Sequence, residues 1–240
     1  MGEVIGFLSG KGGTGKSAIC AGVAQGLASR GHRVLCIDLN AGLPGLDLAL
    51  GLGELPCLTF ADVCGGGYSL EQATVHPVFE NISFLSAPVE QCPLTGLDGL
   101  LAQAKEEFAF VLLDGPAGIG ENFSQIAGLC DRVALVAGYD PDAVRCAARV
   151  GDLLELNGCR NVRMIINRVN LQAFKVLKIN ADDLMDRAGL PLLGVVPEDG
   201  YVLLAAANGI PLYKQTSRGA TAACDRIARR ILGQSVPVKV

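Results

Sequence analysis

Hydrophobic residues are concentrated in seven short runs that are spread along the whole chain. Most of these runs are continuously apolar and rich in β-branched residues, which is typical of strands that are buried on both faces of a sheet. They lie at residues 3–8, 33–37, 81–85, 108–113, 132–137, 161–166 and 192–196. The pattern therefore predicts a sheet in the interior of the molecule.

Stretches with helical periodicity separate the apolar runs. They cover residues 16–30, 97–107, 142–157, 172–188 and 216–232. One helix start is clearly marked, because Asp140 can cap the helix and Pro141 can occupy its first position, where no N–H is needed. Alternating strands and helices predict an α/β fold with a mostly parallel, twisted sheet and helices on both faces. Since no linker or repeat interrupts the pattern, we expect residues 1–240 to form a single domain.

The first apolar run leads directly into a glycine-rich loop that precedes a helical stretch. The loop reads Gly10-Lys11-Gly12-Gly13-Thr14-Gly15-Lys16-Ser17. It fills every fixed position of the phosphate-binding P-loop, in the strand-loop-helix context that this motif requires. Backbone N–H groups from Gly10 to Ala18 are expected to surround the phosphates, with Lys16 on the β- and γ-phosphates and the Ser17 hydroxyl on Mg²⁺. The alternative, a tight turn without function, does not explain Lys-Ser in register with four glycines.

Lys11 is not required for phosphate binding within one chain, and by itself it could be a solvated loop lysine. With Lys11, however, the loop resembles that of the deviant-Walker P-loop ATPases of the MinD/ParA family, which reads KGG-x-GK followed by Ser or Thr. In that family the first lysine reaches across a nucleotide-sandwich dimer to the partner's phosphates. The resemblance therefore implies the three-layer P-loop NTPase fold, ATP or ADP with Mg²⁺, and an ATP-dependent homodimer.

The second apolar run is followed by a segment similar to the first switch region of MinD-like proteins. Asp38, Gly42-Leu43 and Leu46-Asp47 match that region, but Asn40 replaces its second Asp. In the family this carboxylate is tied to hydrolysis, whereas an asparagine cannot take a proton. Because phosphoryl transfer depends mainly on positioning and charge stabilisation, we expect slow hydrolysis. A nucleotide-dependent binding module with negligible hydrolysis is the alternative. The expected catalytic residues are Lys11, Lys16, Asp38 and Asn40.

The run at 108–113 delivers Asp114 at the end of a predicted strand, as in a Walker B motif, which places a carboxylate near the Mg²⁺ ion. The following residues, Gly115-Pro116-Ala117-Gly118-Ile119, are close to the second switch of MinD-like proteins, with Gly115 the one departure. Ser17, Asp38 and Asp114 are therefore the expected magnesium ligands.

Two later segments also resemble the family and are expected to surround the adenine base. Asn167-Arg168 follows a late strand, where the family uses the Asn amide to read adenine. Pro197-Glu198 follows the last predicted strand, in the position of the family's Pro-Glu-Asp loop. Taken alone, each pair is also an ordinary turn sequence. The resemblance spans roughly residues 3 to 237.

Within the family the chain is most similar to MinD-like proteins, which place the division septum, while relatives set flagellar number or segregate DNA. DNA binding is not expected from the net charge of −4. The charge is uneven, however, with 5 basic and 12 acidic residues in 1–120 against 15 and 12 in 121–240. We therefore expect a protein partner from a division or positioning system, and no nucleic acid.

The ends of the chain and its cysteines bear on location. No secretory signal begins the sequence, and nine cysteines without any C-x-x-C spacing are typical of reduced, buried thiols, so we expect a cytoplasmic protein. Cys224, Ile227, Ala228 and Ile231 recur at helical spacing and are expected to pack into the core. The chain ends where the family's amphipathic tail would begin. Any membrane association is therefore expected to be weak, or to place the protein at the inner face of the cell membrane through a partner.

Overall fold

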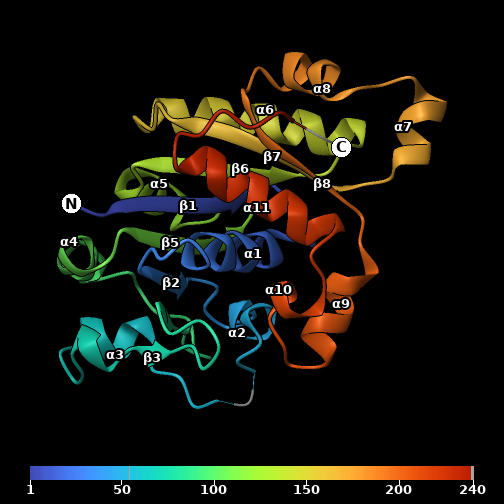
Figure 1. Cartoon of the computed structure of the whole chain (residues 1–240). Helices are drawn as coiled ribbons and strands as arrows, with labels where there is room; N and C mark the ends of the chain where they lie inside the picture. Colours follow the sequence, from blue (N-terminus) through green and yellow to red (C-terminus); the bar gives the residue numbers. More distant parts are fainter. Residues whose placement is uncertain (54, 239–240) are drawn as a thin grey trace.

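Eight strands form one sheet in the computed structural model, which describes residues 1–53 and 55–238. The strands are β1 Glu3–Ser9, β2 Val34–Asp38, β3 Thr74–Val75, β4 Ile82–Leu85, β5 Phe110–Ala117, β6 Arg132–Ala137, β7 Val162–Val169 and β8 Leu192–Pro197. Their order across the sheet is β3-β4-β2-β5-β1-β6-β7-β8, and only the pairing of β3 with β4 is antiparallel among the described pairs. The predicted α/β class with a mostly parallel sheet is confirmed (Figure 1).

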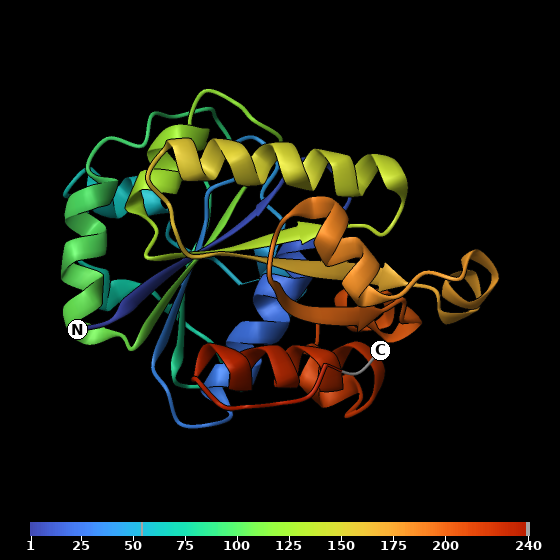
Figure 2. The ribbon, with the colours of Figure 1, turned by 90° about the horizontal axis from the view of Figure 1, so that it is seen from above.

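Helices cover both faces of the sheet, as predicted. On one face the core includes residues of α1 Lys16–Ala28, α2 Leu46–Leu50, α9 Gly200–Ala207, α10 Leu212–Gln215 and α11 Gly219–Ile231. On the other it includes residues of α3 Phe60–Cys64, α4 Leu97–Glu107, α5 Phe123–Leu129, α6 Pro141–Leu156, α7 Leu171–Leu177 and α8 Ala181–Ala188. Figure 2 shows α1 and α11 on the side of the sheet opposite α6. The three layers leave the carboxyl ends of the central strands at one edge.

All seven predicted strands are present, with ends that shift by a few residues. The prediction that Asp114 stands at the tip of its strand is wrong, because β5 continues to Ala117. The extra residues pair with the end of β1, where Ser9 is opposite Ala117 across an irregular register. The sequence missed β3, whose two residues are too few for a periodic signal.

The predicted helix over residues 172–188 is wrong as one element, because the structure divides it into α7 and α8. Lys178 adopts the left-handed conformation with φ of 51° and ends α7. Asn180 then starts α8 with a capping box, in which its side chain accepts from the Asp183 N–H and the Asp183 carboxylate accepts from the Asn180 N–H. Figure 2 shows α7 projecting away from the sheet.

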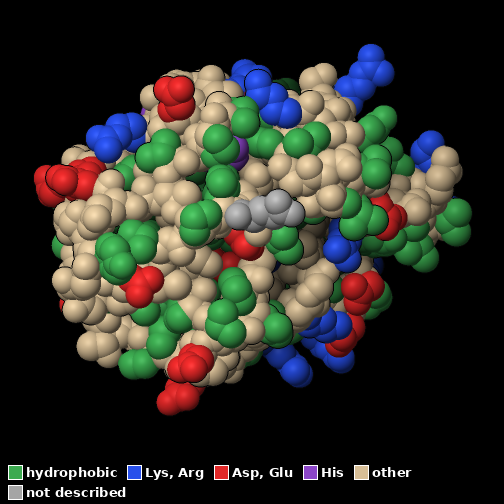
Figure 3. Space-filling model, turned by 90° about the horizontal axis from the view of Figure 1, so that it is seen from below, with side chains coloured by type: hydrophobic (Ala, Val, Ile, Leu, Met, Phe, Trp, Pro, Cys, Tyr) green, Lys and Arg blue, Asp and Glu red, His purple; other side chains and the backbone are tan. Residues whose placement is uncertain are grey.

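The last helix packs into the core, as expected. Cys224, Ile227, Ala228 and Ile231 on α11 are buried among residues of α1 and β8. No described helix combines the length and the apolar character that crossing a bilayer requires. All nine cysteines are free thiols, of which Cys20, Cys36, Cys159 and Cys224 are buried. Figure 3 shows acidic and basic side chains interspersed on one face of the molecule, with hydrophobic side chains in several separate groups.

Candidate functional site

The glycine-rich loop lies at the carboxyl end of β1 and passes directly into α1. Gly13 and Gly15 have positive φ angles of 75° and 83°, which glycine adopts without steric cost. A Cβ atom at Gly12 or Gly13 would meet nothing within 4 Å, so this stretch of backbone is open, whereas at Gly15 it would collide with the Asn167 amide. The loop therefore presents an uncovered backbone in front of the N-terminus of α1, which is the geometry that binds phosphate.

Two buried carboxylates lie beside the loop because β2 and β5 are neighbours. Asp38 and Asp114 occupy paired positions in these parallel strands, and neither is exposed to solvent. Lys16 forms a buried ion pair with Asp114 Oδ1. Burial raises the pKa of Asp114, and the Lys16 ammonium opposes this effect. The sheet thus unites residues that the sequence separates by almost 100 positions.

Asn40 joins the two carboxylates through its side-chain amide. Its Nδ2 donates to Asp38 Oδ1 at 2.7 Å and to Asp114 Oδ2 at 3.2 Å. Asp38 is further fixed by backbone N–H groups of Gly45 and Leu46, which donate to Oδ2 at 2.9 and 3.0 Å. An aspartate at position 40 would place a third negative charge against two buried ones, so the amide suits this geometry electrostatically.

The oxygen donors here fit a magnesium ion that is shared with phosphate. The Ser17 hydroxyl hydrogen-bonds Asp114, and Asp38 lies on the adjacent strand. Across the described residues, no group of three or more His, Cys, Asp or Glu side chains could hold a metal unaided. Mg²⁺ prefers one or two carboxylates together with water and substrate phosphates, a set that these donors would share with a bound nucleotide. Ser17, Asp38 and Asp114 would hold it.

Lys11 is tied to the first turn of α6. Its Nζ forms an ion pair with Asp142 Oδ2, and Arg145 Nη2 donates to the other carboxylate oxygen at 2.9 Å. The hydrogen bond to Asp142 raises the pKa of Lys11, and the Lys11 and Arg145 cations lower the pKa of Asp142. The Lys11 side chain therefore contacts α6, whereas the Lys16 side chain contacts Asp114 on β5.

The predicted base-binding residues line a pocket of about 390 Å³ next to the loop. Asn167, Arg168, Pro197 and Glu198 all line it, together with Gly15 and Ala18 at the start of α1. Arg168 has a positive φ of 56°, and the Asn167 Nδ2 donates to Thr14 O at 2.7 Å. The pocket and the phosphate loop thus form one continuous site.

Two contributors to the site were missed by sequence reasoning. Asp142 is 131 positions from its partner Lys11, and nothing in the local sequence indicates the contact. Tyr139 lines a second hollow of about 350 Å³ beside Lys11 and Gly12. Tyr139 precedes α6 and Asp142 lies in its first turn, where the marked helix cap at Asp140 was the only available signal.

A strand, a glycine-rich loop and a helix with a buried Lys–Asp pair define a P-loop nucleotide-binding protein. The sequence model of the CobQ/CobB/MinD/ParA nucleotide-binding domain matches residues 5–212. The chain therefore belongs to this family.

Individual relatives agree over the full length of the chain. It is 32% identical to the septum site-determining protein MinD of Bacillus subtilis, covering 100% of this chain and 92% of that protein. It is 36% identical to a putative MinD of Nephroselmis olivacea, covering 98% and 89%. The structure matches MinD in the MinC:MinD cell division protein complex of Aquifex aeolicus with a TM-score of 0.92, at 29% identity over 99% and 98% of the two chains. It also matches MinD complexed with Mg-ADP from Pyrococcus horikoshii, with a TM-score of 0.84 and 27% identity over 96% of each chain.

Proposed function

We propose that this chain is a MinD-type ATPase switch that takes part in the placement of the division septum. ATP with Mg²⁺ binds at the P-loop and closes two copies into a homodimer, and slow hydrolysis reopens them. The observation that carries this proposal is the convergence of Lys16, Asp38, Asn40 and Asp114 beside an open phosphate loop. Relatives named for septum site determination over nearly their whole length support the biological role.

The dimer is supported by the surface around the loop. Leu43 and Ile119, in the two switch segments, are 87% and 53% exposed and offer apolar side chains that a second copy would cover. Lys11 is 42% exposed and held by a surface ion pair, which exchanges at little cost. Release of Lys11 from Asp142 would make it available to the phosphates of a second copy. The related MinD in a MinC:MinD complex suggests that the closed dimer binds a division protein.

A nucleotide-dependent binding module with negligible hydrolysis is the second candidate. Asn40 favours it, because its amide donates to both carboxylates and carries no group that accepts a proton from an attacking water. Roles in flagellar number or DNA segregation are less well supported, since the relatives named above are septum proteins.

The proposal is tested first by separating nucleotide binding from dimerisation. Lys16→Ala is expected to lose most affinity for ATP, because the ammonium at the β- and γ-phosphates is gone. Lys11→Ala is expected to bind ATP but stay monomeric in light scattering with Mg-ATP. Lys105→Ala, on α4 at the opposite edge of the sheet, is the matched control and should retain both properties. Equal loss of ATP binding in the Lys11 and Lys16 variants would contradict the cross-dimer role.

The biological role is tested separately by deleting the gene and measuring septum positions. We expect septa away from midcell, with complementation by the wild-type chain and not by Lys16→Ala. Normal septa with altered flagellar number would overturn the division role while leaving the ATPase switch intact.

A further inference from the structure

A separate pocket, distinct from the two beside the P-loop, lies at the opposite edge of the sheet. It measures about 560 Å³ and is lined at the starts of strands, by Glu3 on β1, Phe110 on β5 and Arg132 on β6. The end of α11 closes it, with Arg230 in the last turn and Leu232 directly after the helix. The P-loop follows the other end of β1, about 20 Å away at 3.3 Å per residue. The nucleotide site therefore does not account for this pocket.

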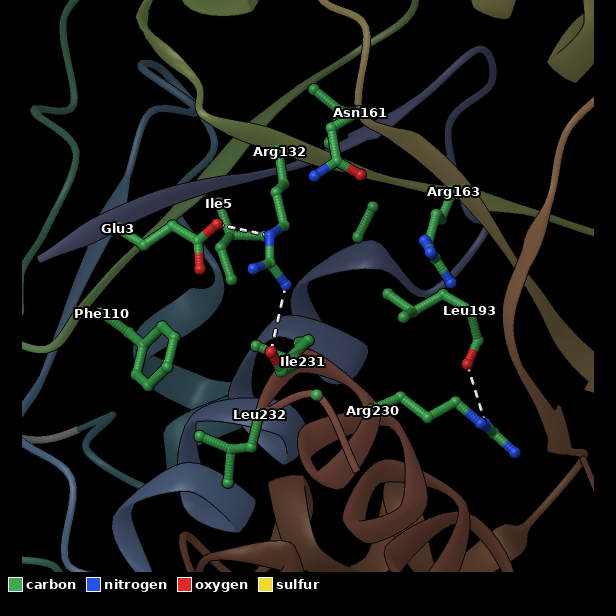
Figure 4. Close-up of a pocket in the computed structure, with 13 residues that line it drawn as sticks. Glu3, Ile5, Phe110, Arg132, Asn161, Arg163, Leu193, Arg230, Ile231 and Leu232 are labelled. Atoms are coloured by element: carbon green, nitrogen blue, oxygen red, sulfur yellow. Dashed lines mark hydrogen bonds and ion pairs between the residues drawn. The ribbon is translucent and has the colours of Figure 1, made fainter. Parts of the chain in front are cut away.

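The pocket has an apolar part and a cationic part. Figure 4 shows Phe110 and Leu232 on one side, Arg163 and Arg230 on the other, and Arg132 between them. Its volume lies within the range of about 300–1,000 Å³ that is usual for small-molecule sites.

Arginine charge exceeds the negative charge of the pocket lining. Arg132 forms an ion pair with Glu3, the one acidic residue that lines the pocket, and donates Nη1 to Ile231 O at 3.0 Å. Arg163 has no ion-pair partner within residues 1–53 and 55–238. Arg132 is thus neutralised, while Arg163 and Arg230 bring two further positive charges.

Arg230 is held in place but incompletely bonded. Its Nη1 donates to Leu193 O at 2.8 Å and its Nε to Val236 O at 3.0 Å. Its Nη2 is buried and has no hydrogen-bond partner among the described residues. Burial and the neighbouring Arg226 lower the pKa of Arg230. Arg230 is therefore fixed at the wall of the pocket, where it contributes positive charge and not a free hydrogen-bond donor.

We propose that this pocket binds a phosphomonoester with an apolar substituent. A phosphomonoester carries about −1.5 to −2 charges at pH 7, which matches the two positive charges that Arg163 and Arg230 add to the pocket better than one carboxylate does. The planar guanidinium group of Arg163, which is exposed, is suited to phosphate oxygens. The substituent packs against Phe110, Ile5 and Leu232. The site is separate from the proposed ATPase switch and does not depend on it.

The test is calorimetric titration of phenyl phosphate into protein saturated with Mg-ADP, which keeps the probe out of the P-loop. We expect saturable binding that Arg163→Gln weakens about tenfold, the effect of losing a charge-assisted hydrogen bond. Arg163 is exposed, so its replacement should leave the fold intact, and a circular dichroism spectrum checks this. Arg149→Gln, an exposed arginine on α6 outside the pocket, is the matched control and should bind like the wild type.

Further arms identify the chemistry and its source. Inorganic phosphate should bind at least tenfold more weakly than phenyl phosphate, and benzyl alcohol should give no saturable heat. Flotation with phosphatidylcholine vesicles, with and without phosphatidic acid, asks whether a lipid headgroup supplies the phosphomonoester. Arg163-dependent binding of either phenyl phosphate or phosphatidic acid supports the site. No such binding, equal affinity in wild type and Arg163→Gln, or equal affinity for inorganic phosphate would overturn the proposal.

Discussion

Asn40 decides how this site differs from the switch pattern that it resembles. Its amide donates to both Asp38 and Asp114, two carboxylates that are fully buried on neighbouring strands. An aspartate could accept a proton from water but would repel both neighbours. The asparagine therefore gives a neutral, well-bonded arrangement where an aspartate would add a third carboxylate.

The replacement Asn40→Asp is expected to accelerate steady-state phosphate release by about tenfold to a hundredfold, at or below the usual effect of a positioned base. The physical reason is that the new carboxylate can accept the proton of the attacking water. Asn40→Ala removes the amide without adding a base and should give no acceleration. If Asn40→Asp is no faster than wild type, the role assigned to this position is wrong.

His76 provides a pH-dependent contribution to stability. Its buried ring donates from Nε2 to Leu50 O at 2.9 Å and accepts at Nδ1 from the N–H groups of Val78 and Phe79. Burial lowers the pKa of His76 below its ordinary value of 6.5, so the folded state favours the neutral ring. Protonation would turn the Nδ1 acceptor into a donor facing two N–H groups.

We expect His76 to make its full contribution to the free energy of unfolding above about pH 6.5. Below that value the free energy of unfolding should fall, because the unfolded chain binds the proton more readily than the folded chain does. Urea unfolding at pH 7.5, 6.5 and 5.5 measures this. His76→Gln should reduce the slope across that interval. An unchanged slope in the variant would show that other groups cause the pH dependence.

At the scale of elements, the division between α7 and α8 illustrates how caps override periodicity. Helical periodicity through residues 172–188 predicted one helix. Lys178 adopts the left-handed backbone conformation, however, and the Asn180–Asp183 capping box begins a new helix. Two short helices result, and α7 extends outward on the side of the molecule that carries the carboxyl ends of the strands (Figure 1).

Asn180→Ala should destabilise the chain by about 1 kcal/mol, the usual cost of losing an N-cap side chain. The Asp183 N–H would lose its acceptor, and an eight-residue helix has few other hydrogen bonds to compensate. Urea unfolding monitored by circular dichroism gives the difference. Asp186→Ala, at an exposed position inside the same helix, should not destabilise, because alanine favours helix. Equal losses in both variants would contradict the capping role.

At the scale of the whole molecule, the parallel sheet has two chemically different edges. Carboxyl ends of the strands carry the phosphate loop, the two aspartates and the base pocket, whereas the opposite edge carries the arginine-lined pocket. The sheet is buried between two helical layers, so both edges are attached to one rigid core.

Mg-ADP is expected to stabilise the folded chain by about 2.7 kcal/mol at a concentration one hundred times the Kd, because only the folded state holds the site. For a chain of this length that corresponds to a rise of about 5–10 °C in the Tm. Thermal unfolding with and without Mg-ADP measures it. Lys16→Ala should lose the shift and also melt earlier without ligand, since Asp114 would lose the cation that offsets its buried charge. A wild-type Tm that is the same with and without Mg-ADP would contradict nucleotide binding at this site.

Local sequence determined the parts of this protein whose physics is local. Continuous apolar runs predicted seven strands, because every side chain of a strand that is buried on both faces points into an apolar layer. The loop from Gly10 to Ser17 predicted the phosphate cradle, because positive φ angles and an exposed backbone require glycine in series.

Only the tertiary structure decided which distant side chains meet. Strand order placed Asp38 beside Asp114, folding of α6 brought Asp142 to Lys11, and the closing turn of α11 gathered arginines from three elements into one pocket. These contacts depend on strand order and helix packing, which join positions up to 153 residues apart among the pairs within the nucleotide site. A local pattern carries no record of such partners, because the same short segment is compatible with many neighbours.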